Sequence, residues 1–206
     1  MKIQLTISIL FLTVFSYAQK SKVLEGNYKS LKGVEVYNLV FDYSDVQIEG
    51  YNSEEEYLQE QMREMEKKEV GKGAKYRDEW FSDRAYRYEP RFVESFNEYF
   101  KKGEVKVVKN LIDSEYTMKV HTTYIYPGYH GGVVWKESKI NAIIFVYKTK
   151  SPSEILLKVE VKGALGYYQG EKAVLRGFAY HVGERIGFSY WSLGKYFAKR
   201  FRMGIK

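Results

Sequence analysis

The sequence lacks cysteine, and that absence removes several classes of chemistry. With no Cys among 206 residues, the chain can form no disulfide, no thiolate metal site and no cysteine nucleophile. The lipidated N-terminal cysteine of bacterial lipoproteins is excluded for the same reason. Proline is also scarce, at three residues, and the 17 glycines do not suggest a collagen-like chain. We therefore expect an ordinary globular protein.

Short motifs that specify a reaction are absent as well. The chain has no His-Glu-x-x-His, no Gly-x-Ser-x-Gly and no phosphate-binding P-loop. Its histidines are His121, His130 and His181. The first two could approach each other, but no Asp or Glu at a short spacing completes a ligand set with them, so we expect no metal and no cofactor. Asp42 and Asp45 close the first predicted strand and are candidate catalytic groups with His121. Carboxylates at such a place more often end a strand and cap a turn.

Only the start of the chain carries a long apolar stretch. Residues 1–18 have the layout of a secretory signal peptide, in which Lys2 precedes the apolar stretch and small residues, Ser16 and Ala18, stand at the −3 and −1 positions. The stretch is too short for a membrane-spanning helix, which needs roughly 20 apolar residues. We expect export to the periplasm or beyond, no transmembrane span in the mature chain, and a single domain over 19–206.

The charge balance is basic, with 33 Lys and Arg against 26 Asp and Glu. For an exported protein the accessible anions are lipid headgroups, lipopolysaccharide and acidic polysaccharide, so we expect no nucleic-acid partner. The simpler interpretation, which we favour, is that the charge only maintains solubility. A basic run on the last predicted helix, at Lys195, Lys199 and Arg202, is a weaker candidate surface.

Hydrophobic periodicity predicts the elements and the fold class. A period of two predicts strands over 33–46, 105–108, 116–126, 139–148 and 155–162. A period near 3.6 predicts helices over 53–69, 90–102 and 184–203. Residues 71–89 show no clear period and could form a lid, a binding loop or a helix, and residues 171–183 are ambiguous between loop and helix. Together the elements predict an α+β fold, with a mixed or antiparallel four- to five-stranded sheet and helices mainly on one face.

The most distinctive segment is rich in aromatic residues and glycine and runs from residue 124 to residue 135. As a hairpin loop it would place Tyr126, Tyr129, His130 and Trp135 on a tip whose glycines leave little side chain to bury them. Large, stiff side chains with a polar handle suit recognition of a protein or a sugar. The alternative is a glycine-rich hairpin whose aromatic rings pack back on the sheet, and the sequence leaves both open.

The element order carries a resemblance. With the signal peptide and the segment Phe41-Asp42-Tyr43-Ser44, it resembles poorly characterised bacterial exported proteins whose fold is like the amino-terminal domain of the periplasmic TolB protein and the core of the curli secretion lipoprotein. The resemblance implies envelope assembly rather than catalysis. Because the lipidated cysteine is missing, it does not imply pore formation, and it carries over no functional residue.

These observations favour an exported, non-enzymatic binding or assembly protein. Its partner would be another envelope protein or a surface polymer, and its oligomeric state is left open. The competing class is a hydrolase that acts on cell-envelope or extracellular material through Asp42, Asp45 or His121.

Overall fold

The computed structural model describes residues 19–100, 103–132, 134–166 and 181–206. The predicted signal peptide and most of the ambiguous segment 171–183 lie outside these ranges. The strands are β1 Lys20–Gly26, β2 Val36–Asp42, β3 Gln47–Ile48, β4 Lys106–Lys109, β5 Tyr116–Tyr126, β6 Tyr129–Gly131, β7 Val134–Lys136, β8 Lys139–Lys148 and β9 Ser151–Leu165. The helices are the 3-10 turn η1 Tyr28–Leu31, α1 Glu54–Lys68, α2 Lys72–Asp83, the π-helix η2 Arg84–Tyr88, α3 Glu89–Tyr99 and α4 Val182–Ile205.

The fold is α+β, as predicted, but the main sheet is larger than the predicted four to five strands. It has seven strands in the order β1-β9-β8-β5-β2-β4, with β3 added to β5. It is mixed, because β2 runs parallel to β4 and β5 whereas β5, β8, β9 and β1 pair antiparallel. The prediction missed β1, which is exposed at six of its seven positions and shows no apolar alternation, and β3, which has only two residues.

The central strand β8 shows how the sheet divides its two faces. Ile140, Ala142, Ile144 and Val146 are fully buried. The residues between them belong to the opposite face, where Ile143 and Phe145 are only half-buried. We call the buried side the inner face and the other side the outer face.

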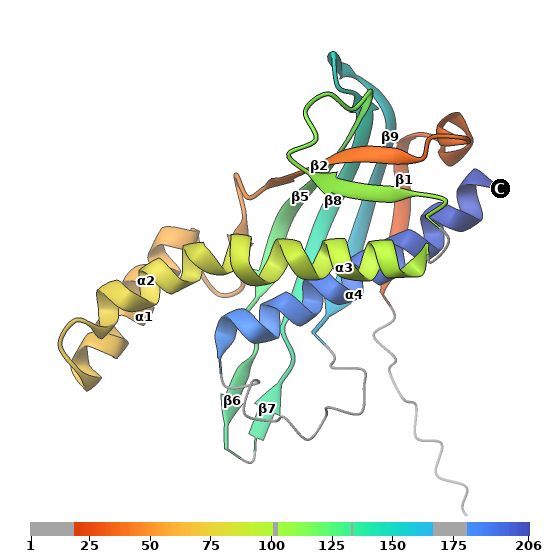
Figure 1. The fold of residues 1–206 in the computed structure, drawn as a ribbon. Coiled ribbons are helices and arrows are strands. Elements are labelled where there is room, and N and C mark those ends of the chain that lie inside the picture. The colour runs from red at the N-terminus through yellow and green to blue at the C-terminus, as the bar shows by residue number, and fades with distance from the viewer. Residues whose placement is uncertain (1–18, 101–102, 133, 167–180) are drawn as a thin grey trace, which may run out of the picture.

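Helices α3 and α4 lie side by side across the inner face (Figure 1). The predicted apolar stripe of α4 is fully buried, and comprises Ile186, Tyr190, Leu193, Phe197 and Phe201. Gly194 lets α4 approach α3 closely, because a Cβ there would lie 2.6 Å from the carbonyl oxygen of Phe92. In the described ranges, no helix is both long and apolar enough to cross a bilayer.

Residues 72–89, within the segment that showed no period, are helical and join α3 without a break. The buried positions of this segment step from Trp80 to Asp83 to Tyr88. The five-residue step from Asp83 to Tyr88 coincides with the π-turn η2, and a buried carboxylate occupies a place where an apolar residue would be expected. The buried positions are therefore shifted along the helix, and one of them carries a charge. These two features explain why hydrophobic periodicity did not predict the helix.

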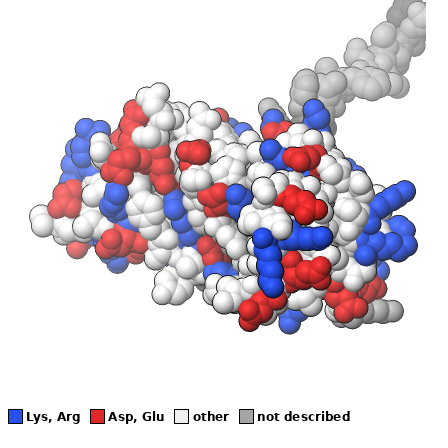
Figure 2. All heavy atoms as spheres, turned by 90° about the horizontal axis from the view of Figure 1, so that it is seen from above, with Lys and Arg blue, Asp and Glu red and all other residues white. Residues whose placement is uncertain are grey.

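Helices α1 and α2 form a hairpin that extends past the edge of the sheet (Figure 1). Ser53 caps the start of α1, since its hydroxyl accepts a hydrogen bond from the Glu56 amide at 3.1 Å. Seen from above, basic and acidic side chains are interspersed over this end of the molecule (Figure 2). This arrangement is typical of a solvated helical surface.

Candidate functional site

The predicted binding tip is the β6–β7 hairpin, which extends beyond the end of the main sheet (Figure 1). Trp135 is 59% exposed and Tyr129 is 47% exposed, so these two rings do not pack back on the sheet. Tyr126 differs from these two rings, because it is half-buried at the end of β5 that leads into the hairpin. The structure therefore places Tyr129 and Trp135 at the tip and Tyr126 on the adjoining sheet.

The strand register divides the tip residues between two sides of the hairpin. His130 pairs with Trp135, whereas Tyr129 pairs with Lys136. Because neighbouring residues of a strand point to opposite sides, Trp135 shares a side with His130, and Tyr129 shares the other with Lys136. The four predicted residues thus do not form one cluster. They give the hairpin an aromatic ring on each side.

The base of the hairpin is fastened to α4 by two side chains. The Arg185 guanidinium donates to the carbonyl oxygens of Pro127, at 3.1 Å, and Gly128, at 3.3 Å. After β7, in the connection to β8, the buried Ser138 hydroxyl donates to the carbonyl oxygen of Arg185 at 2.6 Å. Gly128 has a φ of +67°, and a Cβ there would lie 2.4 Å from the carbonyl oxygen of Lys136. The exposed rings therefore rise from a fixed base.

Sequence reasoning missed Arg185 and Ser138, which lie 47 residues apart in the chain. One signal was available for Arg185, because it lies in the first turn of the predicted helix, where the helix dipole disfavours a cation. An arginine in that place needs other partners, and here they are the hairpin carbonyls. Burial lowers the pKa of Arg185, although nearby tyrosines oppose that shift.

The candidate catalytic groups are partly brought together. Asp42 pairs with His121 across β2 and β5, and 3.1 Å separates Asp42 Oδ2 from His121 Nδ1. Asp45 lies in the following turn, exposed and with a φ of +61°. The Ser44 hydroxyl donates to Asp42 at 2.7 Å, and the Ser44 amide donates to the same oxygen at 3.0 Å. Asp42 therefore caps the turn, as the commoner interpretation predicted.

The neighbours of Asp42 favour the ionised form of its carboxyl group. Burial raises the pKa of this carboxyl, but the hydrogen bonds from Ser44 and the charges of His121 and Lys119 outweigh burial and lower the pKa to about 2. The base within hydrogen-bond reach of the Ser44 hydroxyl is Asp42, and a carboxylate with a pKa of about 2 is too weak a base to take the proton of a serine. Within the described ranges, no three His, Asp or Glu side chains gather as metal ligands would.

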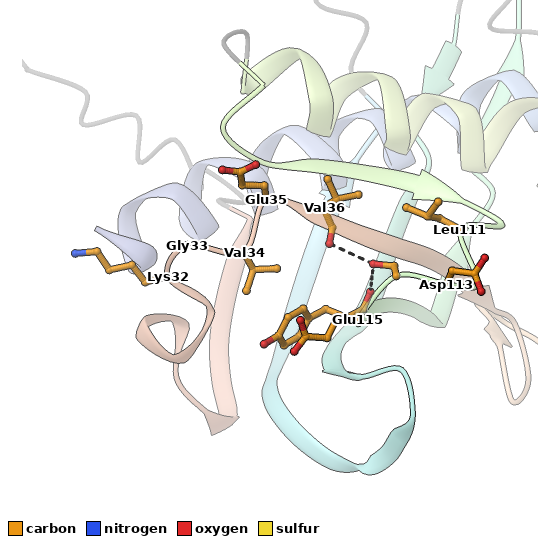
Figure 3. Close-up of a pocket in the computed structure, with 10 residues that line it drawn as sticks. Lys32, Gly33, Val34, Glu35, Val36, Leu111, Asp113 and Glu115 are labelled. Atoms are coloured by element: carbon orange, nitrogen blue, oxygen red, sulfur yellow. Dashed lines mark hydrogen bonds between the residues drawn. The ribbon is translucent and has the colours of Figure 1, made fainter.

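An open hollow of about 700 Å³ lies elsewhere, between the segment before β2 and the connection from β4 to β5. The Ser114 hydroxyl donates there to the carbonyl oxygens of Val36, at 3.3 Å, and Tyr116, at 3.1 Å (Figure 3). The charged side chains Glu35 and Asp113 lie at separate corners of the hollow (Figure 3). Neither Asp42 nor His121 lines it, so the hollow and the carboxylate pair are separate features.

Comparison with known proteins gives only a distant structural resemblance. No family model and no curated protein sequence matches the chain. Two solved structures of a PelC dodecamer from Paraburkholderia phytofirmans are similar to it in part. The first is 6% identical over 85% of this chain and 97% of PelC, with a TM-score of 0.35. The second, a point variant, is 8% identical over 86% of this chain and 99% of PelC, with a TM-score of 0.34.

Proposed function

We propose that the protein is exported and acts as a non-enzymatic binding or assembly protein of the cell envelope. Its β6–β7 hairpin would contact another envelope protein or a surface polymer. The observation that carries this proposal is the combination of a fastened base, at Arg185 and Ser138, with exposed rings, at Tyr129 and Trp135. The layout of residues 1–18 supports export.

The geometry suits binding for a physical reason. Ordering a flexible loop on association costs free energy, which a loop that is already fixed in the free protein does not lose again. Tyrosine and tryptophan add large contact areas with few rotatable bonds, and both are enriched among the residues that dominate binding energies. A fixed hairpin with a ring on each side could enter a groove and touch both of its walls.

A hydrolase that acts on envelope or extracellular material is the second candidate. The observation that favours it is the 3.1 Å approach of Asp42 and His121. Against it, Asp42, which accepts the hydrogen bond of the Ser44 hydroxyl, is a weak base with a pKa of about 2. The pair also lies outside the 700 Å³ hollow. Replacing His121 by Ala would abolish hydrolysis of an envelope substrate if this alternative were correct.

The binding proposal is tested by affinity capture from an envelope extract, followed by mass spectrometry. The bait is the mature chain, either unchanged or with Tyr129→Ala and Trp135→Ala. A control variant replaces two residues that are more exposed and lie outside the hairpin, Tyr86 at 78% and Ile112 at 75%. We expect the tip variant to lose its specific partner and the control to retain it.

Two results would contradict the binding proposal. One is equal capture by the tip variant and the control variant, which would show that the hairpin rings make no specific contact. The other is a loss of several kcal/mol of stability in the tip variant, detected as a lower melting temperature. Truncation of buried aromatic residues has an effect of that size. In that case the rings would belong to the core.

A further inference from the structure

The outer face of the sheet carries aromatic rings with lysines placed over them. In the first group, Phe145 of β8 lies between Lys119 of β5 and Lys158 of β9 in the strand register. The two ammonium groups are 4.8 and 5.2 Å from the centre of the ring. Both distances are within the range of a cation–π interaction.

A second group lies at the hairpin end of the same face. Lys139 is 5.2 Å from the ring centre of Tyr124 and 5.8 Å from that of Tyr126. Lys136 approaches the Tyr126 ring at 5.2 Å. Residues 139 and 145 are six positions apart on β8, so the two groups are about 20 Å apart along the strand.

Lysines outnumber carboxylates on this face. Eight lysines lie on or beside it: Lys20, Lys22, Lys106, Lys119, Lys136, Lys139, Lys158 and Lys162. The carboxylates are Glu25, Asp42, Glu49 and Glu160. Asp42 pairs with Lys119 and Glu160 pairs with Lys162. Among the described residues, no ion pair involves Lys136, Lys139 or Lys158, and all three lie over aromatic rings.

We infer that the outer face binds an acidic polysaccharide, with Lys136, Lys139 and Lys158 holding carboxylate groups along the polymer. The inference rests on the proposed function for the location of the protein outside the cytoplasm, and it names one class of surface polymer. A lysine whose ammonium group is held over an aromatic ring by a cation–π contact has few other positions to adopt, so this group is already placed for an anion that approaches from solvent. The rings offer an apolar platform for the C–H faces of sugar rings.

The spacing favours a chain over a single small anion. Two positive groups about 20 Å apart on one face of a sheet match repeated charges on an extended polymer. In addition, none of the three lysines lines the 700 Å³ hollow. Attraction between such a surface and a polyanion is sensitive to salt, because binding releases counterions and exposed charges are screened.

The test measures binding of polygalacturonate, a linear acidic polysaccharide, to the mature chain at low and high salt. The same polymer with all its carboxylates methyl-esterified is the uncharged control. We expect binding of the acidic form only, and roughly tenfold weaker binding for the variant K136Q/K139Q/K158Q. Replacing the same three lysines by Arg should keep the affinity.

A matched variant removes three lysines from the opposite layer, K195Q/K199Q/K206Q, at exposed positions on or just after α4. We expect it to bind within about twofold of the unchanged protein, because exposed charges more than about 10 Å away are largely screened. Equal losses in the two triple variants would overturn the inference, since net charge alone would then explain binding. Absence of binding to polygalacturonate would also overturn it, as would binding only to phosphatidylglycerol vesicles.

The tip variant separates this inference from the proposed function. Loss of polymer binding with Tyr129→Ala and Trp135→Ala, but not with the outer-face variant, would overturn the inference and leave the hairpin proposal standing. Conversely, polymer binding that depends on Lys136, Lys139 and Lys158 supports the inference even if partner capture does not require the hairpin.

Discussion

The two faces of the sheet are built from the same strands but carry different chemistry. On β5, β8 and β9 the inner positions Val120, Ile144 and Val159 are fully buried under α3 and α4. Each of these residues has a sequence neighbour on the outer face. The three neighbours, Lys119, Phe145 and Lys158, form a half-exposed row. The comparison shows that a period of two lets one strand contribute both to the core and to a candidate binding surface.

The largest expected effect on stability distinguishes two neighbouring residues of β8, one on each face of the sheet. Replacing Ile144 by Ala should lower the free energy of unfolding by about 2–5 kcal/mol, because the change leaves a cavity beneath the helices. Replacing Phe145 by Ala should cost clearly less, although more atoms are removed, since that ring is half-exposed. Urea denaturation of both variants measures the difference, and equal losses would show that the outer face is also core.

The next effect concerns the attachment of the hairpin to α4. Replacing Arg185 by Met keeps the length of the side chain but removes its hydrogen bonds to Pro127 and Gly128, so we expect a loss of about 1–2 kcal/mol. Amide hydrogen exchange should accelerate in β6 and β7 more than in β8. Uniform acceleration throughout the sheet would mean that Arg185 stabilises the domain rather than the hairpin.

A smaller effect follows from the pKa of Asp42. This carboxyl has a pKa of about 2 in the folded protein, against 3.8 ordinarily. The unfolded chain therefore takes up the proton first, and the stabilisation present above pH 4 is lost as the pH falls towards 2. We expect a contribution of about 1 kcal/mol, since solvent screens this group. Unfolding measured from pH 2 to pH 6 should show a shallower acid loss for Asp42→Asn.

The smallest effect is expected at the hairpin tip. Replacing Tyr129 and Trp135 by Ala should change the free energy of unfolding by about 0.5 kcal/mol or less, because these rings are largely exposed in the free protein. Thermal unfolding measures this change. A nearly unchanged free energy of unfolding, combined with loss of partner capture, would sharpen the distinction between surface and core.

Most of the long elements could be predicted because their own residues carry the signal. The helix that became α4 and the strands that became β5 and β8 are long, strongly patterned and close to their predicted bounds. Elements without such a pattern were missed. The edge strand β1 gains its conformation from hydrogen bonds to β9, and the π-turn at Arg84–Tyr88 interrupts the helical period.

The candidate site could be predicted only in outline. Composition identified Tyr129 and Trp135 as aromatic residues on a glycine-rich tip, but their division between two sides follows from the register of β6 and β7. The pairing of Asp42 with His121 needed the parallel contact of β2 with β5. Strand pairing between distant segments is a property of the assembled sheet.

The sequence by itself determined the α+β class, the lack of thiol chemistry and the aromatic, glycine-rich hairpin, because composition and periodicity are local properties. Only the tertiary structure decided which residues meet. It brought Arg185 and Ser138 together at the hairpin base, and it placed Lys119 and Lys158 over Phe145. The physical reason is that each contact joins separate elements, whose relative positions depend on packing of the whole core.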